Sequence, residues 1–212
     1  MPLSARRWLE LWQRLGAPRS ADGALANEFA ALSQRYAEKH RHYHTAQHIA
    51  ECLARFDEAH TLCEHADEVE LALWFHDAIY EPRAKDNEAQ SAAWAQRVMQ
   101  AAGLTREAAQ RVRALILKTC HNAQAETRDE AVLIDIDLAI LGAETARFDE
   151  YEKQVRAEYA WVPDFLFNRT RRKILDEFLA RPALYTTPHF NAAREKKARE
   201  NLARSLSGLA GN

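Results

Sequence analysis

Residues that favour tight turns are scarce in this chain, whereas residues that favour helices are abundant. Glycine and proline account for only six residues each out of 212, too few for a β-rich fold with many turns. Alanine, leucine, glutamate, arginine and glutamine dominate instead, and these are strong helix formers. Because 47% of the residues are hydrophobic and 28% are charged, the chain has enough apolar material for a globular core. We expect one all-α domain over residues 1–212.

Hydrophobic residues recur at intervals of three and four along most of the chain, which predicts helices. Ser4 and Thr45 can each cap a helix, and Gly16 with Pro18 ends the first one. The segment from Ala66 to Ile79 is apolar on several sides, which predicts a central helix. The stretch VLIDIDLAI alternates as a strand would, but its flanks are helical and we interpret it as helix. We expect nine or ten helices, at about 4–15, 22–39, 45–56, 66–79, 88–102, 105–120, 128–141, 144–161, 164–180 and 190–206.

Charge and cysteine content exclude several classes of protein. The 29 basic residues nearly balance the 31 acidic ones, so we expect no bulk nucleic-acid binding. No apolar run is long enough to span a membrane, and MPLSARRWLELWQRLG carries charges where a signal peptide needs an apolar stretch. Cys52, Cys63 and Cys120 show no CxxC spacing, which fits ordinary thiols in a reducing compartment. We therefore expect a cytoplasmic protein, and the sequence leaves its oligomeric state open.

Histidines cluster in one short stretch of the sequence. Four of the nine lie within nine residues, at His40, His42, His44 and His48. On a helix, two residues four positions apart share a face and lie about 6 Å apart along the axis. His44 and His48 have this spacing, which suits a metal or phosphate site. An exposed polar turn with a chance enrichment of histidine is the alternative.

Two other segments place acidic residues among apolar ones. His76 and Asp77 follow an apolar run in LALWFHDAIY, and Asp135 and Asp137 lie within VLIDIDLAILG. Burying an unpaired carboxylate costs on the order of several kcal/mol, so each needs a helix cap, an arginine or a cation. Together with the histidines, these acids favour a metal site. Mixed imidazole and carboxylate ligands suit one divalent transition metal (Mn, Fe, Co, Ni or Zn) better than Mg.

Taken in order, these blocks resemble the HD superfamily of metal-dependent phosphohydrolases, in which His, His-Asp and Asp lie on separate helices of an all-α domain. The resemblance runs from about Arg41 to Leu202. It is carried by RHYHTAQHI, WFHDAIYEP, DNEAQSA, DIDLAILG, VRAEYAWV and FLARPALYTTPHF. It implies a single HD-type helical bundle over residues 1–212, with a motif core at about 41–142 and the C-terminal helices packed on that core.

The resemblance also implies the ligands of one divalent metal ion, namely His48, His76, Asp77 and Asp137. Asp137 is preferred to Asp135 because the last ligand in this family commonly takes the second position of an acid-x-acid pair. His44 matches the histidine of the cyclic-nucleotide phosphodiesterase signature YHNxxH, which implies a general acid. Thr45 stands where that signature has asparagine.

The implied reaction is hydrolysis of a phosphate ester by a metal-activated water, with a small phosphorylated metabolite such as a nucleotide as substrate. The candidates for the group that accepts the proton of the water are Asp77, Glu81 and Glu88. For Glu81 and Glu88, a solvated loop and a helix start are equally good explanations.

Three residues are candidates for binding the substrate phosphate, namely Arg41, Lys118 and His121. Surface solvation is the alternative for Arg41 and Lys118. His121 follows the predicted helix 105–120, where a histidine can also satisfy terminal carbonyl groups or bind a second metal ion.

Two other functions remain open from the sequence. An HD-fold di-iron oxygenase would need His121 and further histidines as ligands of a second metal. A non-catalytic module would use the same pocket to bind a nucleotide or a signalling phosphate. Purely structural roles for the acids and histidines are the remaining alternative.

Overall fold

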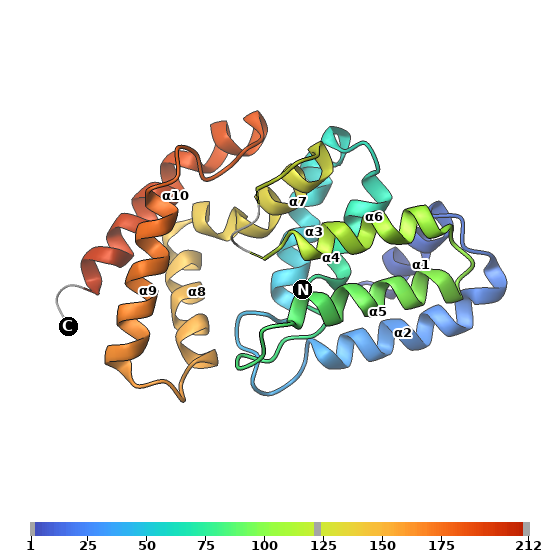
Figure 1. Ribbon diagram of the computed structural model, residues 1–212, viewed down its shortest axis with the longest axis horizontal. Helices are drawn as coiled ribbons and strands as arrows, with labels where there is room; N and C mark the ends of the chain where they lie inside the picture. Colours follow the sequence, from blue (N-terminus) through green and yellow to red (C-terminus); the bar gives the residue numbers. More distant parts are fainter. Residues whose placement is uncertain (1–2, 121–123, 210–212) are drawn as a thin grey trace. The chain divides into compact units, whose positions relative to one another are not determined.

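The computed structural model describes residues 3–120 and 124–209, which form ten α-helices, three short 3-10 helices and no strand (Figure 1). The prediction of an all-α fold with nine or ten helices is therefore confirmed. The helices are α1 (Ala5–Arg14), α2 (Asp22–Arg35), α3 (Ala46–Ala59), α4 (Ala66–Phe75), α5 (Asn87–Ala101), α6 (Arg106–Leu117), α7 (Arg128–Asp137), α8 (Thr145–Glu158), α9 (Asp164–Leu179) and α10 (Pro188–Gly208). The short 3-10 helices are η1 (Arg19–Ala21), η2 (His60–Leu62) and η3 (Leu138–Gly142). Within the described residues, no helix has the length and apolar character needed to cross a membrane.

Hydroxyl side chains begin five of these helices. Each accepts a hydrogen bond from a backbone N–H group two or three residues later, and these residues are Ser4, Thr45, Thr105, Thr127 and Thr187. Such caps satisfy backbone donors that have no partner inside the helix. The caps predicted at Ser4 and Thr45 are confirmed.

Two predicted helices, α2 and α4, end four residues earlier in the structure than the periodicity of the sequence indicates, and α6 and α8 end three residues earlier. Helix α2 ends at Arg35 rather than near residue 39, and α4 ends at Phe75 rather than near residue 79. The backbone after α4 bonds to side chains instead of continuing the helix: Ser91 Oγ accepts from the Ile79 N–H at 2.9 Å. Because Ser91 lies twelve residues further along the chain, in α5, local periodicity does not reveal this hydrogen bond.

The predicted helix over 128–141 also differs, because it divides into α7 and η3. Contacts divide the chain near the same place into two compact units, and the boundary between them in the sequence falls between Ile134 and Asp135. The single HD-type domain over residues 1–212 stays a prediction from the sequence.

The first unit is built around α4. Every residue from Glu68 to Phe75 is buried, and α1, α3, α5 and α6 all pack against this helix. Trp8 of α1 is fully buried and meets Trp74 edge to face, with ring centroids 5.4 Å apart. The prediction of a central helix in this segment is therefore confirmed, although the helix is four residues shorter than expected.

Two buried acids on α4 are matched by arginines. Glu70 accepts hydrogen bonds from Arg7 and Arg14 of α1, and Glu68 accepts two from Arg111 of α6. Because removing one partner of a buried pair leaves an uncompensated charge, these pairs fix how α1 and α6 meet α4. They account for these two acids without any metal ion.

In the second unit, α10 packs against η3 and α9, and α8 packs against η3. A close approach occurs at Gly142, where a Cβ atom would lie 2.7 Å from Arg194 Cβ and 3.0 Å from the Tyr185 hydroxyl. The Tyr185 hydroxyl accepts from the Gly142 N–H and donates to the Leu138 carbonyl. A residue without a side chain therefore allows η3 to contact α10.

Candidate metal centre

Three of the predicted ligands meet within the first unit. His48 lies in the first turn of α3, and His76 and Asp77 follow directly after the last residue of α4. The Nε2 atoms of His48 and His76 are 3.1 Å apart. Asp77 Oδ2 lies 3.1 Å from His76 Nε2 and 3.4 Å from His48 Nε2. Both histidines are buried, whereas the Asp77 side chain is 19% exposed.

These separations fit the donors of one transition-metal ion. Metal–nitrogen and metal–oxygen bonds of about 2.1 Å place neighbouring ligands about 3.0 Å apart at right angles and about 3.4 Å apart at tetrahedral angles. All three measured distances lie in this range. The partial exposure of Asp77 leaves one side of this cluster in contact with solvent.

The orientation of His76 is fixed by the backbone of its own helix. Its Nδ1 lies 3.0 Å from the Leu73 carbonyl oxygen, and because a carbonyl only accepts, Nδ1 carries the proton. Nε2 is therefore the ring nitrogen that faces His48 and Asp77. A carbonyl bonded to the second ring nitrogen is the usual support of a metal-binding histidine.

Asp77 is held in its charged form. Burial raises the pKa of Asp77, but the nearby imidazoles of His76 and His44 and hydrogen bonds from His48 and His76 act in the opposite direction. Their combined effect places the pKa of Asp77 well below its ordinary value. The group is therefore a carboxylate near neutral pH, the form in which it binds a cation.

His44 lies beside these donors, immediately before α3. Its ring centroid is 6.1 Å from that of His48 and 4.0 Å from that of Tyr80, on which it stacks. The two histidines are therefore close, as their spacing predicts, although His44 precedes the helix rather than belonging to it. Its half-buried side chain keeps access to solvent.

Arg41 lies behind the donors and bonds to the backbone. Its side chain is fully buried, and its guanidinium donates to the carbonyl oxygens of His44, Asp77 and Ala78 at 3.1, 2.6 and 3.0 Å. Its Nε donates to Glu38 at 3.0 Å. Arg41 thus joins the segment before α3 to the segment after α4, and its predicted role in binding phosphate stays a prediction.

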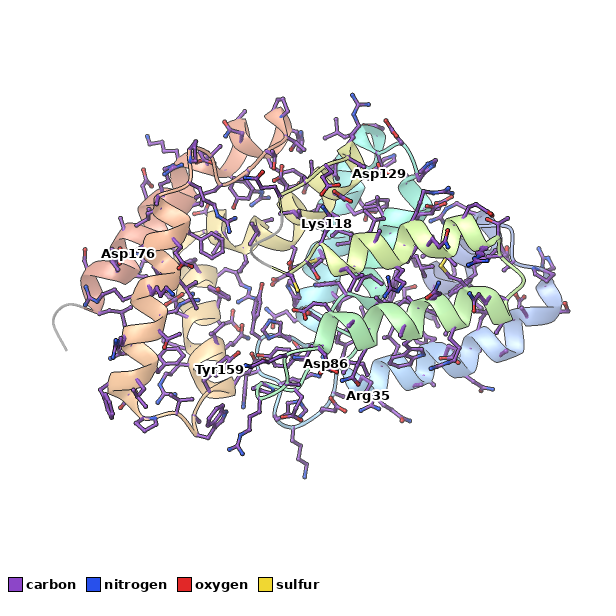
Figure 2. The ribbon with its side chains drawn as sticks, viewed as in Figure 1. Arg35, Asp86, Lys118, Asp129, Tyr159 and Asp176 are labelled. Carbon is purple, nitrogen blue, oxygen red and sulfur yellow. The ribbon has the colours of Figure 1, made fainter. Side chains whose placement is uncertain are left out.

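The other predicted polar residues lie in loops and helix ends. Lys118, which is labelled in Figure 2, donates to Glu126 at 2.7 Å and lies 3.5 Å from Glu130, so it is already ion-paired. Glu81 is exposed, and its backbone N–H donates to Asn87 Oδ1 at 3.0 Å.

Glu88 and His121 are the remaining residues that the sequence predicts near the site. Glu88 is half-buried in the first turn of α5. Burial raises the pKa of the Cys120 thiol, and the nearby carboxylate of Glu88 raises it further. His121 lies outside the described residues.

The two acids of the DIDLAILG block differ in their surroundings. Asp135 is fully buried, and its carboxylate accepts hydrogen bonds from the backbone N–H and the hydroxyl of both Thr186 and Thr187, at 2.6–3.4 Å. Both carboxylate oxygens are therefore occupied by the start of α10. Asp137 is the last residue of α7 and is half-buried. The hydrogen bonds of Asp135 explain its burial and favour Asp137 as the ligand of the pair.

Sequence reasoning missed Cys52, which lies one turn after His48 on the same face of α3. Its sulfur is buried and lies 3.7 Å from both ring nitrogens of His48. The ligand atoms of His48, Cys52 and His76 all lie within 4.8 Å of one another. Equal distances to both nitrogens place the sulfur against the ring, so Cys52 packs on His48 and is a weaker ligand candidate than Asp77. Its spacing of four from His48 was the available signal.

Comparisons with known proteins do not add a family. No protein-family model, curated protein or solved structure matches this chain.

Proposed function

We propose that this chain is a metal-dependent phosphohydrolase of the HD type. The observation that carries the proposal is the convergence of His48 Nε2, His76 Nε2 and Asp77 Oδ2 at 3.1–3.4 Å from one another. Three donors of this kind, one of them a carboxylate whose pKa is lowered, suit a divalent transition metal better than a structural hydrogen-bond cluster. The resemblance to the HD superfamily supplies Asp137 as a fourth ligand.

A divalent metal held by His48, His76 and Asp77 would supply the acidity that activates water and the positive charge that a phosphate ester needs. His44 donates a proton to the departing oxygen, and stacking on Tyr80 holds its ring in place. Glu81 accepts a proton from the water, since its exposed carboxylate follows closely after Asp77. The substrate is a small phosphorylated metabolite, with a nucleotide as one example.

The metal content of the purified chain tests the ligand set. We expect about one transition metal per chain in the wild type and in His65→Ala, and almost none in His48→Ala. His65 is the matched control because it is an exposed histidine of the same unit whose side chain makes no cap hydrogen bond. Mass spectrometry of the protein reconstituted with Mn, Co, Ni or Zn provides the measurement.

Hydrolysis of generic phosphate esters tests the reaction. We expect the metal-loaded wild type to cleave p-nitrophenyl phosphate or bis(p-nitrophenyl) phosphate, and His48→Ala to lose this activity. Two irons per chain with substrate-dependent oxygen uptake would replace the proposal with a di-iron oxygenase. Tight nucleotide binding without turnover under any metal would replace it with a binding module.

A further inference from the structure

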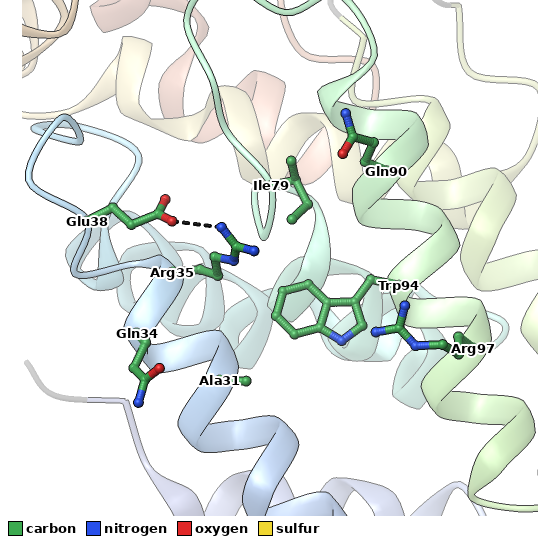
Figure 3. A pocket seen from close by; sticks show the side chains of 8 residues that line it. All are labelled: Ala31, Gln34, Arg35, Glu38, Ile79, Gln90, Trp94 and Arg97. Carbon is green, nitrogen blue, oxygen red and sulfur yellow. Dashed lines mark hydrogen bonds and ion pairs between the residues drawn. The ribbon is translucent and has the colours of Figure 1, made fainter.

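A hollow of about 630 Å³ opens in the first unit, lined by α2, α5 and Ile79 (Figure 3). Small-molecule pockets typically measure about 300–1,000 Å³, so this volume is adequate for a ligand of nucleotide size. None of the donors of the candidate metal centre is among the residues that line it. The hollow is therefore a separate feature of the first unit.

Polar side chains belong to five of the eight residues that line the hollow. Arg35 of α2 and Arg97 of α5 place two guanidinium groups there, and Gln34 and Gln90 add two amides. Glu38 is the one acid of the lining, and it pairs with Arg35 at 2.9 Å. Within the described residues, Arg97 has no hydrogen bond or ion pair, so its charge is available to a ligand.

We propose that this hollow binds a small molecule through a phosphate group that it carries. Guanidinium groups match phosphate oxygens in pairs of parallel N–H···O bonds, and amide N–H groups provide further donors. The apolar wall of Ile79 and the indole of Trp94 can accommodate the rest of the ligand. This binding does not require that the metal centre be catalytic.

A chain of contacts joins the hollow to the metal donors. One oxygen of Glu38 accepts from Arg35 and the other accepts from Arg41 at 3.0 Å. Arg41 in turn donates to the backbone carbonyl of Asp77 at 2.6 Å. A phosphate that binds Arg35 competes with Glu38, and this changes the charge balance around Arg41. Any effect of the ligand on metal affinity would be matched by an equal effect of the metal on ligand affinity, because such coupling is reciprocal.

Calorimetric titration of metal-free protein with adenosine monophosphate tests the binding site. The protein is kept in chelator, and Asp77→Asn serves as a second background without a functional metal centre. We expect saturable binding in both. Arg97→Gln should weaken binding about 10- to 100-fold, as the loss of a hydrogen-bonded charge predicts. Arg113→Gln is the matched control, because Arg113 is an exposed arginine of α6 outside the hollow, and it should bind as the wild type does.

Adenosine, which lacks the phosphate, should bind at least tenfold more weakly than adenosine monophosphate. Equal binding of the two would overturn the inference, as would wild-type affinity in Arg97→Gln. Binding that disappears in Asp77→Asn but survives in Arg97→Gln would place the ligand at the metal centre instead. Absence of metal or of hydrolysis would contradict the proposed function alone, because the titration is carried out without metal.

Discussion

Asp135 and Asp137 lie two residues apart in one acidic block, yet their surroundings differ. The carboxylate of Asp135 accepts hydrogen bonds from Thr186 and Thr187 at the start of α10. In an Asp135→Asn variant, the side-chain NH₂ group would face a backbone N–H group of Thr186 or Thr187, and two donors cannot bond to each other. Asp135→Asn is therefore expected to lower the free energy of unfolding by roughly 1–3 kcal/mol while metal content stays at the wild-type level.

Asp137→Asn is expected to show the opposite pattern, with little change in stability and a loss of bound metal. Urea denaturation measures the first quantity and mass spectrometry of the purified variants measures the second. Loss of metal in Asp135→Asn with retention in Asp137→Asn would show that the ligand had been assigned to the wrong acid.

Single residues also show how far sequence reasoning reaches. The motifs predicted that the side chains of His48, His76 and Asp77 lie together. In the structure, three short distances join their nitrogen and oxygen atoms. The contacts of Arg41 were not predicted, because its acceptors are backbone carbonyls of a segment 36 residues away. A residue type reveals what a side chain can bind, but the partner depends on which backbone atoms the fold leaves without a helical bond.

At the scale of elements, Arg41 holds two segments that carry the proposed metal donors. Arg41→Ala leaves three carbonyl groups without their donor, so we expect weaker metal binding by about 10- to 100-fold, as for other supports of ligands. Arg41→Lys keeps the charge but not the forked geometry of the guanidinium. The metal affinity of this variant should lie between those of the wild type and Arg41→Ala. Metal titration with a competing chelator provides the dissociation constants. Wild-type affinity in Arg41→Ala would contradict this positioning role.

The contact between η3 and α10 depends on the absence of a side chain at Gly142. An added methyl group would lie 2.7 Å from Arg194 Cβ and 2.9 Å from the Arg194 carbonyl oxygen. We expect Gly142→Ala to lower the free energy of unfolding by about 1–3 kcal/mol, as overpacking does elsewhere. Gly208→Ala is the control, because no atom lies within 4 Å of its added Cβ. Chemical denaturation of both variants checks the difference, and equal stability of the two would contradict it.

The helices themselves were predictable, but several of their ends were not. Caps such as Ser4 and Thr45 are local signals, because the bonded N–H lies within three residues. The end of α4 is different, since Ser91 and Arg41 bind the backbone beyond Phe75. Where a helix ends therefore depends on competition from distant side chains, which hydrophobic spacing does not encode.

At the scale of the whole molecule, composition was sufficient to predict an all-α fold, but not the division of the chain into two units. The division falls between Ile134 and Asp135, inside α7. A boundary inside a helix has no glycine, proline or polar linker to mark it. Here only contacts between residues distant in sequence define the units.

Binding of a metal at His48, His76 and Asp77 should stabilise the first unit. A ligand at 100 times its dissociation constant stabilises the native state by about 2.7 kcal/mol, and the slowest-exchanging amides report this gain. We expect added manganese to slow hydrogen exchange in α3 and in residues 66–80. Helix α9 is the internal reference, because it holds none of the proposed ligands.

Mass spectrometry of peptides from the wild type and from His48→Ala provides the measurement. Protection of α3 should disappear in the variant, because the imidazole that binds the ion is absent. Equal protection of α3 and α9 would indicate unspecific stabilisation by the salt, and unchanged exchange in α3 would contradict a metal centre at these residues. Since exchange is read peptide by peptide, the experiment locates the ion on the chain without any assumption about the substrate.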